Sequence, residues 1–238
     1  MPCTSDVLAL VLARQFGVEY QPIVELRTGR TVGHEALSRF ADPAGREVPA
    51  ASVFACLHDD PTLLLFVEVE TKRFQMNQAP AGTLYLNVDA DSFQAGSRVD
   101  RNPLVELLAG RKGETVVEVI EALDVADARL SRGRVDAMRA IGIGVALDDV
   151  GAPDALISLE ALKEADVLKL DRTWLDRIHQ PRDRAVLEAL LGLARRLGSR
   201  TILEGVETPL HLALAEELGV DAVQGFLFRD RFVLRNAS

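Results

Sequence analysis

The chain has 238 residues, which suits one large α/β domain, and its hydrophobic content of 48% is enough for a sizeable core. Its formal net charge of -9 argues against a surface for DNA or RNA duplexes, although a local acidic pocket could hold metal and a phosphate ligand. No apolar run approaches the roughly 20 residues of a membrane span. Two cysteines without metal-ligand spacing, and no signal peptide, predict a cytoplasmic protein.

The first half of the chain is predicted to begin with a helix over Ser5–Phe16 and a β-hairpin. The hairpin pairs Val18–Leu26 with Thr31–Arg39 through a turn at Thr28–Arg30, so its first strand runs antiparallel to its neighbour. The elements predicted next are helices over Ala50–Leu57 and Pro61–Asn77, a strand over Thr83–Asn87, a helix over Arg101–Ala109 and a strand over Thr115–Ile120.

The second half alternates helices and strands. The predicted helices cover Asp124–Ile141, Ala155–Glu164, Trp174–His179, Pro181–Leu197 and Pro209–Leu218, and the predicted strands cover Ile143–Asp148, Val167–Leu170, Arg200–Glu204 and Asp221–Gln224. No linker divides the chain. We therefore expect one domain over residues 1–238, with an N-terminal helix within residues 1–17 and a C-terminal tail without clear periodicity over residues 226–238.

Polar side chains end most of the apolar runs. The run that begins at Val145 stops at the adjacent acids Asp148 and Asp149, and because side chains alternate along a strand we expect these two to point in different directions. Two adjacent carboxylates repel each other unless a cation or a basic residue neutralises them. The alternative is a strand followed by a turn, with Asp148 capping the next helix. The other runs carry Glu35, Asn87, Glu118, Lys169, Glu204 and Gln224. This arrangement is typical of an α/β barrel whose polar strand ends converge on one face.

Eight segments of the chain, in order, resemble the EAL-domain family of cyclic di-GMP phosphodiesterases. The segments are Tyr20–Val24, Glu35–Arg39, Leu86–Val88, Glu118–Glu121, Leu147–Gly151, Lys169–Asp171, Glu204–Thr208 and Gln224–Phe226. The resemblance implies a TIM-like (β/α)8 barrel with one antiparallel strand. It also implies hydrolysis of cyclic di-GMP to linear pGpG with Mg²⁺ or Mn²⁺, a homodimer, and control by a regulatory protein partner.

The resemblance also implies a role for each matched residue. Hard divalent cations favour oxygen ligands, and two of them can activate a water and stabilise both oxygens of a displacement at phosphorus. The matched metal ligands are Glu35, Asn87, Glu118, Asp148 and Asp149. The matched catalytic groups are Glu204, Lys169 and Glu121. Glu204 matches the general base, and Lys169 matches the amine that orients the attacking water and holds Asp149. Glu121 matches the acid that anchors the loop after Asp149. The matched substrate-contact positions are Gln21, Arg39, Asp171, Glu207 and Gln224.

Several of these residues have a simpler structural interpretation. Asn87 could close a loop, Lys169 could be an ion-pair partner, and Arg39 could pair with a surface acid. The four histidines show no mutual spacing and are expected to be structural or surface groups. The single tryptophan, Trp174, is expected to pack on the outer layer of the barrel.

The loop after Asp149 departs from the family pattern. The family has Phe-Gly followed by small, Ser-rich residues, whereas this chain has Val150-Gly151-Ala152-Pro153-Asp154-Ala155. No matched ligand or base is lost, so we expect an active phosphodiesterase that is slow because of the altered loop. The alternative is a catalytically weak or inactive EAL domain that binds cyclic di-GMP or a partner protein as a regulator.

Overall fold

The computed structural model describes residues 4–97, 101–120, 133, 135–153 and 159–237. Its strands are β1 (Phe16–Glu25), β2 (Thr31–Ala41), β3 (Glu47–Val48), β4 (Thr83–Asn87), β5 (Thr115–Ile120), β6 (Gly144–Val150), β7 (Val167–Leu170), β8 (Arg200–Leu203), β9 (Ala222–Val223) and β10 (Val233–Asn236). Its helices are α1 (Thr4–Leu12), α2 (Ala50–Ala55), α3 (Pro61–Asn77), α4 (Ala90–Gly96), α5 (Pro103–Ala109), α7 (Leu159–Glu164), α8 (Thr173–Arg177), α9 (Pro181–Leu197), α10 (Pro209–Leu218) and the 3₁₀ helix η1 (Phe226–Arg231). Residues 135–140 are also helical.

Eight of the strands close into a barrel, as predicted. Neighbours follow the order β1-β9-β8-β7-β6-β5-β4-β2, and a β1–β2 pairing closes the circle. β1 runs antiparallel to both β2 and β9, while every other neighbouring pair within the circle is parallel. The predicted antiparallel hairpin strand is therefore confirmed.

An apolar layer fills the barrel interior, to which each strand contributes one position. Its members are Ile23, Val32, Tyr85, Val116, Ala146, Val167, Ile202 and Ala222. Alternate side chains of a barrel strand face inward, so the next inward residue lies two positions along each strand. This layer is the packed floor beneath the polar strand ends.

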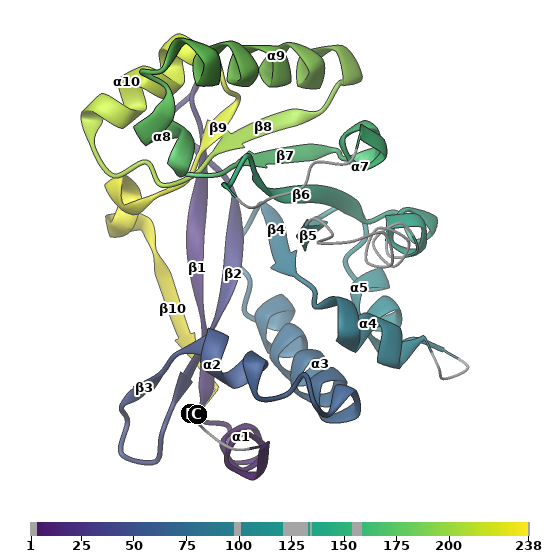
Figure 1. Cartoon of the computed structure of the whole chain (residues 1–238). Helices are drawn as coiled ribbons and strands as arrows, with labels where there is room; N and C mark the ends of the chain where they lie inside the picture. Colours follow the sequence, from purple (N-terminus) through teal and green to yellow (C-terminus); the bar gives the residue numbers. More distant parts are fainter. Residues whose placement is uncertain (1–3, 98–100, 121–132, 134, 154–158, 238) are drawn as a thin grey trace.

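The long β1–β2 ribbon extends beyond the barrel and supports a smaller subdomain (Figure 1). There β3 pairs with the end of β2, and β10 pairs with the first half of β1. A separate apolar cluster binds α1, α2 and α3 to this part of the ribbon through residues that include Val7, Phe16, Phe40, Val53 and Leu64. The predicted tail thus contains η1 and the edge strand β10. Three of the four residues of β10 are exposed, so the segment lacks the hydrophobic alternation that predicts a strand.

The predicted and observed elements differ chiefly at their ends. The predictions for α3, β4, β7, α9 and α10 match at both ends. Pro61 follows the N-cap Asp60, and Gly198 ends α9 in the left-handed conformation, which are strong boundary signals. Helix α4 was not predicted, because it has only seven residues. Much of the predicted helix Asp124–Ile141 and the start of the predicted helix Ala155–Glu164 lie outside the described residues. No helix in the described ranges is both long and apolar enough to cross a membrane.

One buried hydrogen bond fastens the ribbon to α3, and its loss should be measurable. The Tyr20 hydroxyl donates to the Gln75 carbonyl at 2.6 Å, satisfying an acceptor in the last turn of the helix. We expect Tyr20→Phe to lower the free energy of unfolding by about 1–2 kcal/mol in urea titrations. Tyr85→Phe is the matched control, because no hydrogen bond of the Tyr85 hydroxyl is found within the described part of the chain. Equal stability of the two variants would contradict this account.

Candidate active site

Eight polar side chains form a second layer directly above the apolar floor. On every strand except β2, the polar residue lies two positions from the floor residue of the same strand. On β2, Glu35 lies two positions from Gly33, whose backbone packs against Tyr85. The layer consists of Gln21, Glu35, Asn87, Glu118, Asp148, Lys169, Glu204 and Gln224. All eight were singled out in the sequence. Six lie within two residues of the carboxyl end of a parallel strand. Glu35 lies near the end of the parallel pairing of β2 with β4, which stops at Ala36, and Gln21 comes from antiparallel β1. The layer is therefore the mouth of the barrel, where α/β barrels place their sites.

Lys169 occupies the centre of this layer. Its Nζ atom lies 2.7 Å from Glu118, 2.8 Å from Glu204, 3.0 Å from Asp148 and 3.4 Å from Glu35. The lysine side chain is 1% exposed, so these attractions act with little screening by water. Asp149 is not among its ion-pair partners, whereas the resemblance had implied that Lys169 holds Asp149.

The two adjacent aspartates do not point in different directions, as a regular strand would require. The register between β6 and β7 shifts between Leu147 and Val150, and Asp149 adopts a left-handed φ of 54°. Such an irregularity places an extra residue in one strand and re-aims its side chain. As a result, carboxylate oxygens of Asp148, Asp149 and Glu204 lie within 4.8 Å of one another. The expected alternation is therefore wrong here, because it assumes an uninterrupted pleat.

Charges in the layer set unusual ionisation states. Burial raises the pKa of Glu35, but Lys169 and hydrogen bonds from Gln224 and Asn87 outweigh it and hold that pKa below its usual value. Burial alone would lower the pKa of Lys169, but the surrounding carboxylates raise it well above its usual value. Lys169 is consequently a permanent ammonium ion, and Glu35 is a carboxylate.

Three further acids of the site, Glu118, Glu204 and Asp149, are harder to ionise. Burial, reinforced by the negative charge of Glu35, raises the pKa of Glu118 well above its usual value. Burial raises the pKa of Glu204 to about 8, against the opposing effect of Lys169. Burial and the neighbouring Asp148 likewise raise the pKa of Asp149. One ammonium group thus faces five carboxyl groups, and the excess acid is stable only when protonated or when further cations are present.

The residues present fit a divalent cation. Both carboxylate oxygens of Glu118 are buried without a hydrogen-bond partner in the described part of the chain, and one of them has no ion pair either. The Asn87 amide nitrogen donates to Glu35 at 2.9 Å, which leaves its amide oxygen free to act as a ligand. Asp148, Asp149 and Glu204 add a group of close oxygens. These oxygen donors suit a hard ion such as Mg²⁺ or Mn²⁺.

The predicted substrate-contact residues on the ribbon are held by an acid that the sequence analysis did not identify. A single oxygen of Glu19 accepts from Arg39 at 2.6 Å and from Gln21 at 3.0 Å. Glu19 precedes Gln21 by two residues on β1, so alternation could have placed it on the same face. Gln224 donates to Glu35 at 2.6 Å, which makes it a partner of a candidate ligand.

The other candidates lie farther from the layer. Asp171 is half-buried and accepts hydrogen bonds from the backbone and hydroxyl of Thr173 at the start of α8. Glu207 is exposed, and its backbone donates to His211. Glu121 lies outside the described residues. His58 lies 3.0 Å from Asp91 and 3.8 Å from Asp89, a half-exposed group in which the Asp89 side chain caps α4.

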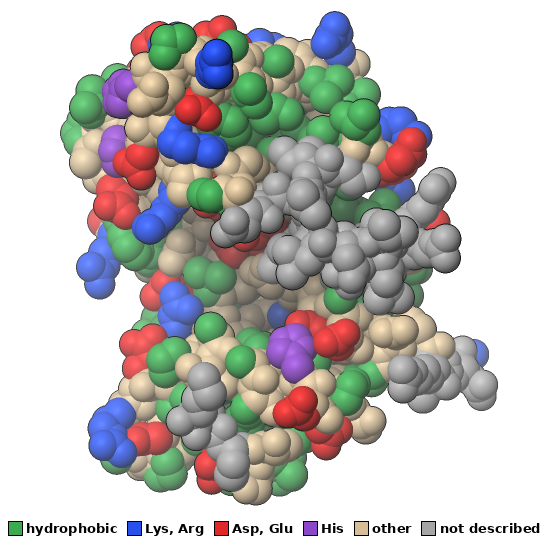
Figure 2. Space-filling view, viewed as in Figure 1, with side chains coloured by type: hydrophobic (Ala, Val, Ile, Leu, Met, Phe, Trp, Pro, Cys, Tyr) green, Lys and Arg blue, Asp and Glu red, His purple; other side chains and the backbone are tan. Residues whose placement is uncertain are grey.

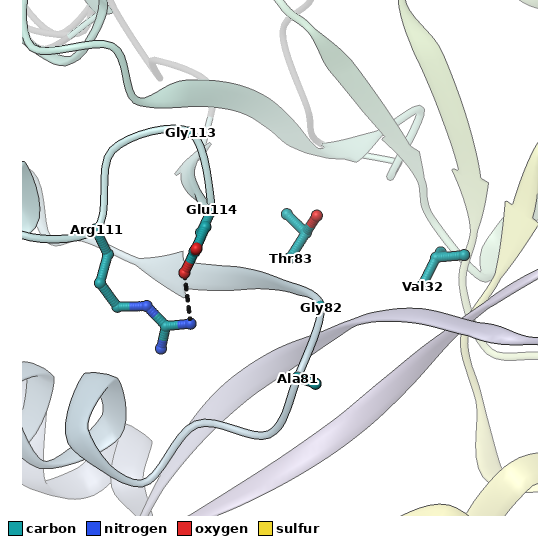
Figure 3. Close-up of a pocket in the computed structure, with 7 residues that line it drawn as sticks. All are labelled: Val32, Ala81, Gly82, Thr83, Arg111, Gly113 and Glu114. Atoms are coloured by element: carbon teal, nitrogen blue, oxygen red, sulfur yellow. Dashed lines mark hydrogen bonds and ion pairs between the residues drawn. The ribbon is translucent and has the colours of Figure 1, made fainter.

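The surface offers two recesses. Figure 2 shows a hollow across the middle of the molecule in which acidic side chains are visible. A separate pocket of about 400 Å³ lies where β4 and β5 begin, at the opposite end from Asn87 and Glu118 (Figure 3). Its one ion pair joins Arg111 to Glu114, and it contains none of the predicted site residues.

Fold and site together define an α/β-barrel protein with an acidic, single-lysine layer at its mouth. The model of the EAL domain family matches residues 5–230, so the chain belongs to the EAL domain family. It is 28% identical over 231 residues to probable cyclic di-GMP phosphodiesterase PdeN of Escherichia coli, covering 93% of this chain and 44% of that protein. It is 29% identical over 240 residues to cyclic di-GMP phosphodiesterase RocR of Pseudomonas aeruginosa, covering 96% of this chain and 60% of that protein.

Solved structures show the same fold. A structure titled "PaMucR Phosphodiesterase, c-di-GMP complex" superimposes with a TM-score of 0.76 and 26% identity, covering 94% of both chains. The Bacillus subtilis YkuI protein, titled as a complex with substrate c-di-GMP and calcium, has a TM-score of 0.76 and 21% identity, covering 94% of this chain and 56% of that one. The chain thus spans less than two thirds of the length of PdeN and RocR.

The central role of Lys169 gives a first prediction for the site. We expect Lys169→Met to destabilise the metal-free protein by about 3–5 kcal/mol, because buried carboxylates lose their counterion. Urea titrations in the presence of a chelator measure this change. Lys163→Met is the control, since its ion pairs with Glu160 and Glu164 are exposed and should contribute little. A loss no larger than that of the control would refute the buried-counterion account.

The raised pKa of Glu204 predicts how metal-free stability depends on pH. Between about pH 5 and pH 8 the native state keeps a proton on Glu204 that the unfolded chain releases. The unfolded state then binds fewer protons, so the free energy of unfolding should fall as pH rises through this window. Glu204→Gln should make the slope shallower, whereas Glu188→Gln on exposed α9 should not. Parallel slopes for the wild type and Glu204→Gln would show that Glu204 titrates normally.

Proposed function

We propose that this chain hydrolyses cyclic di-GMP to linear pGpG in a reaction that requires Mg²⁺ or Mn²⁺. The observation that carries the proposal is the polar layer, in which Lys169 pairs with four carboxyl groups at the mouth of the barrel and Asp149 lies beside two of them. The names of PdeN and RocR, and the ligand in the titles of the related structures, support cyclic di-GMP as the substrate.

Glu35, Asn87, Glu118, Asp148 and Asp149 would hold the ions, most simply as a two-metal site. When bound, such ions lower the pKa of a coordinated water and stabilise the oxygens around the reacting phosphorus. Glu204, which lies close to Asp148 and Asp149, takes the proton of the attacking water as the general base. Lys169 fixes the carboxylates around it. Hydrolysis then forms one phosphorus–oxygen bond to water and breaks one ester bond to the ribose oxygen, which leaves with a proton.

Arg39 and Gln21 are proposed to contact the substrate, with Arg39 offering paired donors to a phosphate oxygen. Glu19 already holds both side chains, so they are pre-arranged along the ribbon. Asp171, Glu207 and Gln224 complete the proposed contacts. A homodimer, a regulatory protein partner and a cytoplasmic location are further parts of the proposal that follow from the family.

A second candidate is a domain that binds cyclic di-GMP or a protein without hydrolysis. The altered loop after Asp149 is the observation that favours it, because the family loop supports the second metal. Its described beginning, residues 150–153, lacks the family's Phe and carries Pro153. A slow enzyme is the intermediate case, and the same assay separates the three.

Two substitutions test hydrolysis directly. Glu204→Gln keeps the shape of the base but cannot accept a proton, so we expect turnover to fall roughly 10²–10⁴-fold. Glu35→Ala removes a candidate ligand and should abolish metal-dependent turnover. Chromatography of the nucleotide after incubation with Mg²⁺, Mn²⁺ or a chelator measures both effects. Glu25→Gln, at the far end of β1, is the matched control.

The outcomes separate the candidates. Product formation by the wild type that the chelator abolishes supports hydrolysis. Binding of the nucleotide without product, under all metal conditions, supports the binding domain. Unchanged turnover in both variants would remove Glu204 and Glu35 from the reaction.

A further inference from the structure

We infer that Trp174 and Arg177 of α8 are positioning residues that fix the left-handed backbone of Asp149. They do so by holding the two carbonyl groups that follow Asp149 in the chain. The inference concerns this chain's own solution to the altered loop, and it rests on the proposed function for the metal-binding role of Asp149.

Asp149 needs such support because its conformation is unfavourable. A non-glycine residue at φ 54° is uncommon, and such a conformation persists where the surrounding structure over-determines it. β6 is irregular at this point, so regular pairing with β7 does not constrain the residue. The backbone turns sharply here, with the Ala152 N–H donating to the Asp149 carbonyl at 3.0 Å.

Trp174 supplies the first contact. Its indole Nε1–H donates to the Val150 carbonyl at 2.8 Å, and the side chain is 4% exposed. The same carbonyl accepts from the Asp171 backbone N–H at 3.2 Å. The ring also packs against the next residue, since a Cβ added at Gly151 would lie 2.3 Å from it. The expectation that Trp174 merely packs on the outside of the barrel is therefore incomplete.

Arg177 supplies the second contact. Its guanidinium donates to the Gly151 carbonyl at 2.6 Å and stacks 4.5 Å above the centre of the Trp174 ring. The two side chains thus form one unit, one turn of α8 apart, that binds consecutive carbonyls. Asp171 fixes the start of α8 through Thr173, which ties this unit to the end of β7 and hence to Lys169.

This arrangement explains how the chain can dispense with the family's phenylalanine. Val150 is buried with Trp174 in one apolar cluster, so the indole occupies space beside a smaller residue and adds a hydrogen bond to its carbonyl. Trp174 holds the Val150–Gly151 peptide, one residue beyond Asp149, and so restricts the rotation of the backbone that carries the Asp149 carboxylate. Loss of either contact should let that carboxylate move away from Asp148 and Glu204.

The first test uses the metal-free protein, so it does not depend on catalysis. Trp174→Phe keeps a ring but removes the N–H, and Arg177→Gln removes the guanidinium. We expect hydrogen exchange of the Gly151 and Ala152 backbone amides to become about fivefold faster in each variant, since a net hydrogen bond is lost. Ser199→Ala is the matched control, because it also removes one buried bond to a backbone carbonyl, that of Ala165. Arg182→Gln controls for loss of an exposed arginine. Wild-type exchange rates in both test variants would overturn the inference.

The second test measures Mg²⁺ alone. Calorimetric titration of the full chain should show affinity reduced roughly 3–10-fold in Trp174→Phe and Arg177→Gln, relative to the wild type and Ser199→Ala. Because Trp174 is the only tryptophan, its emission should also change when Mg²⁺ binds to the wild type, and Asp149→Asn should diminish that change. Equal Mg²⁺ affinity in the wild type and both variants would overturn the inference. A wild type that binds no Mg²⁺ would instead contradict the proposed function, while the exchange measurement still decides the positioning role.

Discussion

The ammonium group of Lys169 is the interaction on which the rest of the site depends. It lies within 3.4 Å of carboxylates from four different strands, and its buried position makes each of these attractions strong. Without it, the acids at the barrel mouth would repel one another with no positive charge between them. With it, four carboxyl groups are drawn to one point but are not neutralised, since Lys169 supplies a single positive charge.

This imbalance reconciles an acidic protein with an anionic ligand. A chain of net charge -9 with a carboxylate-rich site would repel a phosphodiester. Divalent cations reverse that field locally, because they are the largest charges in such a site. The ribbon adds a positive group at Arg39, which Glu19 keeps in place. Binding of an anionic ligand at this acidic site therefore depends on prior binding of the cations.

Much of this could be predicted from the sequence because barrel strands alternate strictly. The polar ends of short apolar runs identified seven of the eight members of the layer, and the family resemblance supplied the eighth, Gln21. The barrel then brought together residues as distant as Gln21 and Gln224. The antiparallel hairpin followed from the turn at Thr28–Arg30, and the barrel followed from the alternation of polar-ended runs with helical segments. Predictions from alternation are wrong where a strand is interrupted by a bulge or another irregularity. The irregularity at Asp149 leaves no periodic signal, since a left-handed residue is a response to contacts with Trp174 and Arg177 that are made across the fold.

Other omissions have the same origin. β10 is exposed on most of its length, so only its partner β1 makes it a strand. Glu19 looks like an ordinary surface acid in a strand until Arg39 is placed diagonally opposite across the ribbon. From the sequence, Trp174 was expected only to pack on the outer layer of the barrel. The role of its indole N–H becomes visible only when the fold places the Val150 carbonyl beside it.

The apolar floor determines how molecules can enter and leave the barrel. One side chain from each strand seals the lumen below the polar layer, from Ile23 around to Ala222. The barrel is therefore open at its polar mouth and closed by the apolar floor beneath it. Water and ions, as well as the nucleotide proposed as the substrate, must all enter and leave through the mouth of the barrel. The time that a bound molecule takes to leave through this opening would therefore limit how soon the next one can bind.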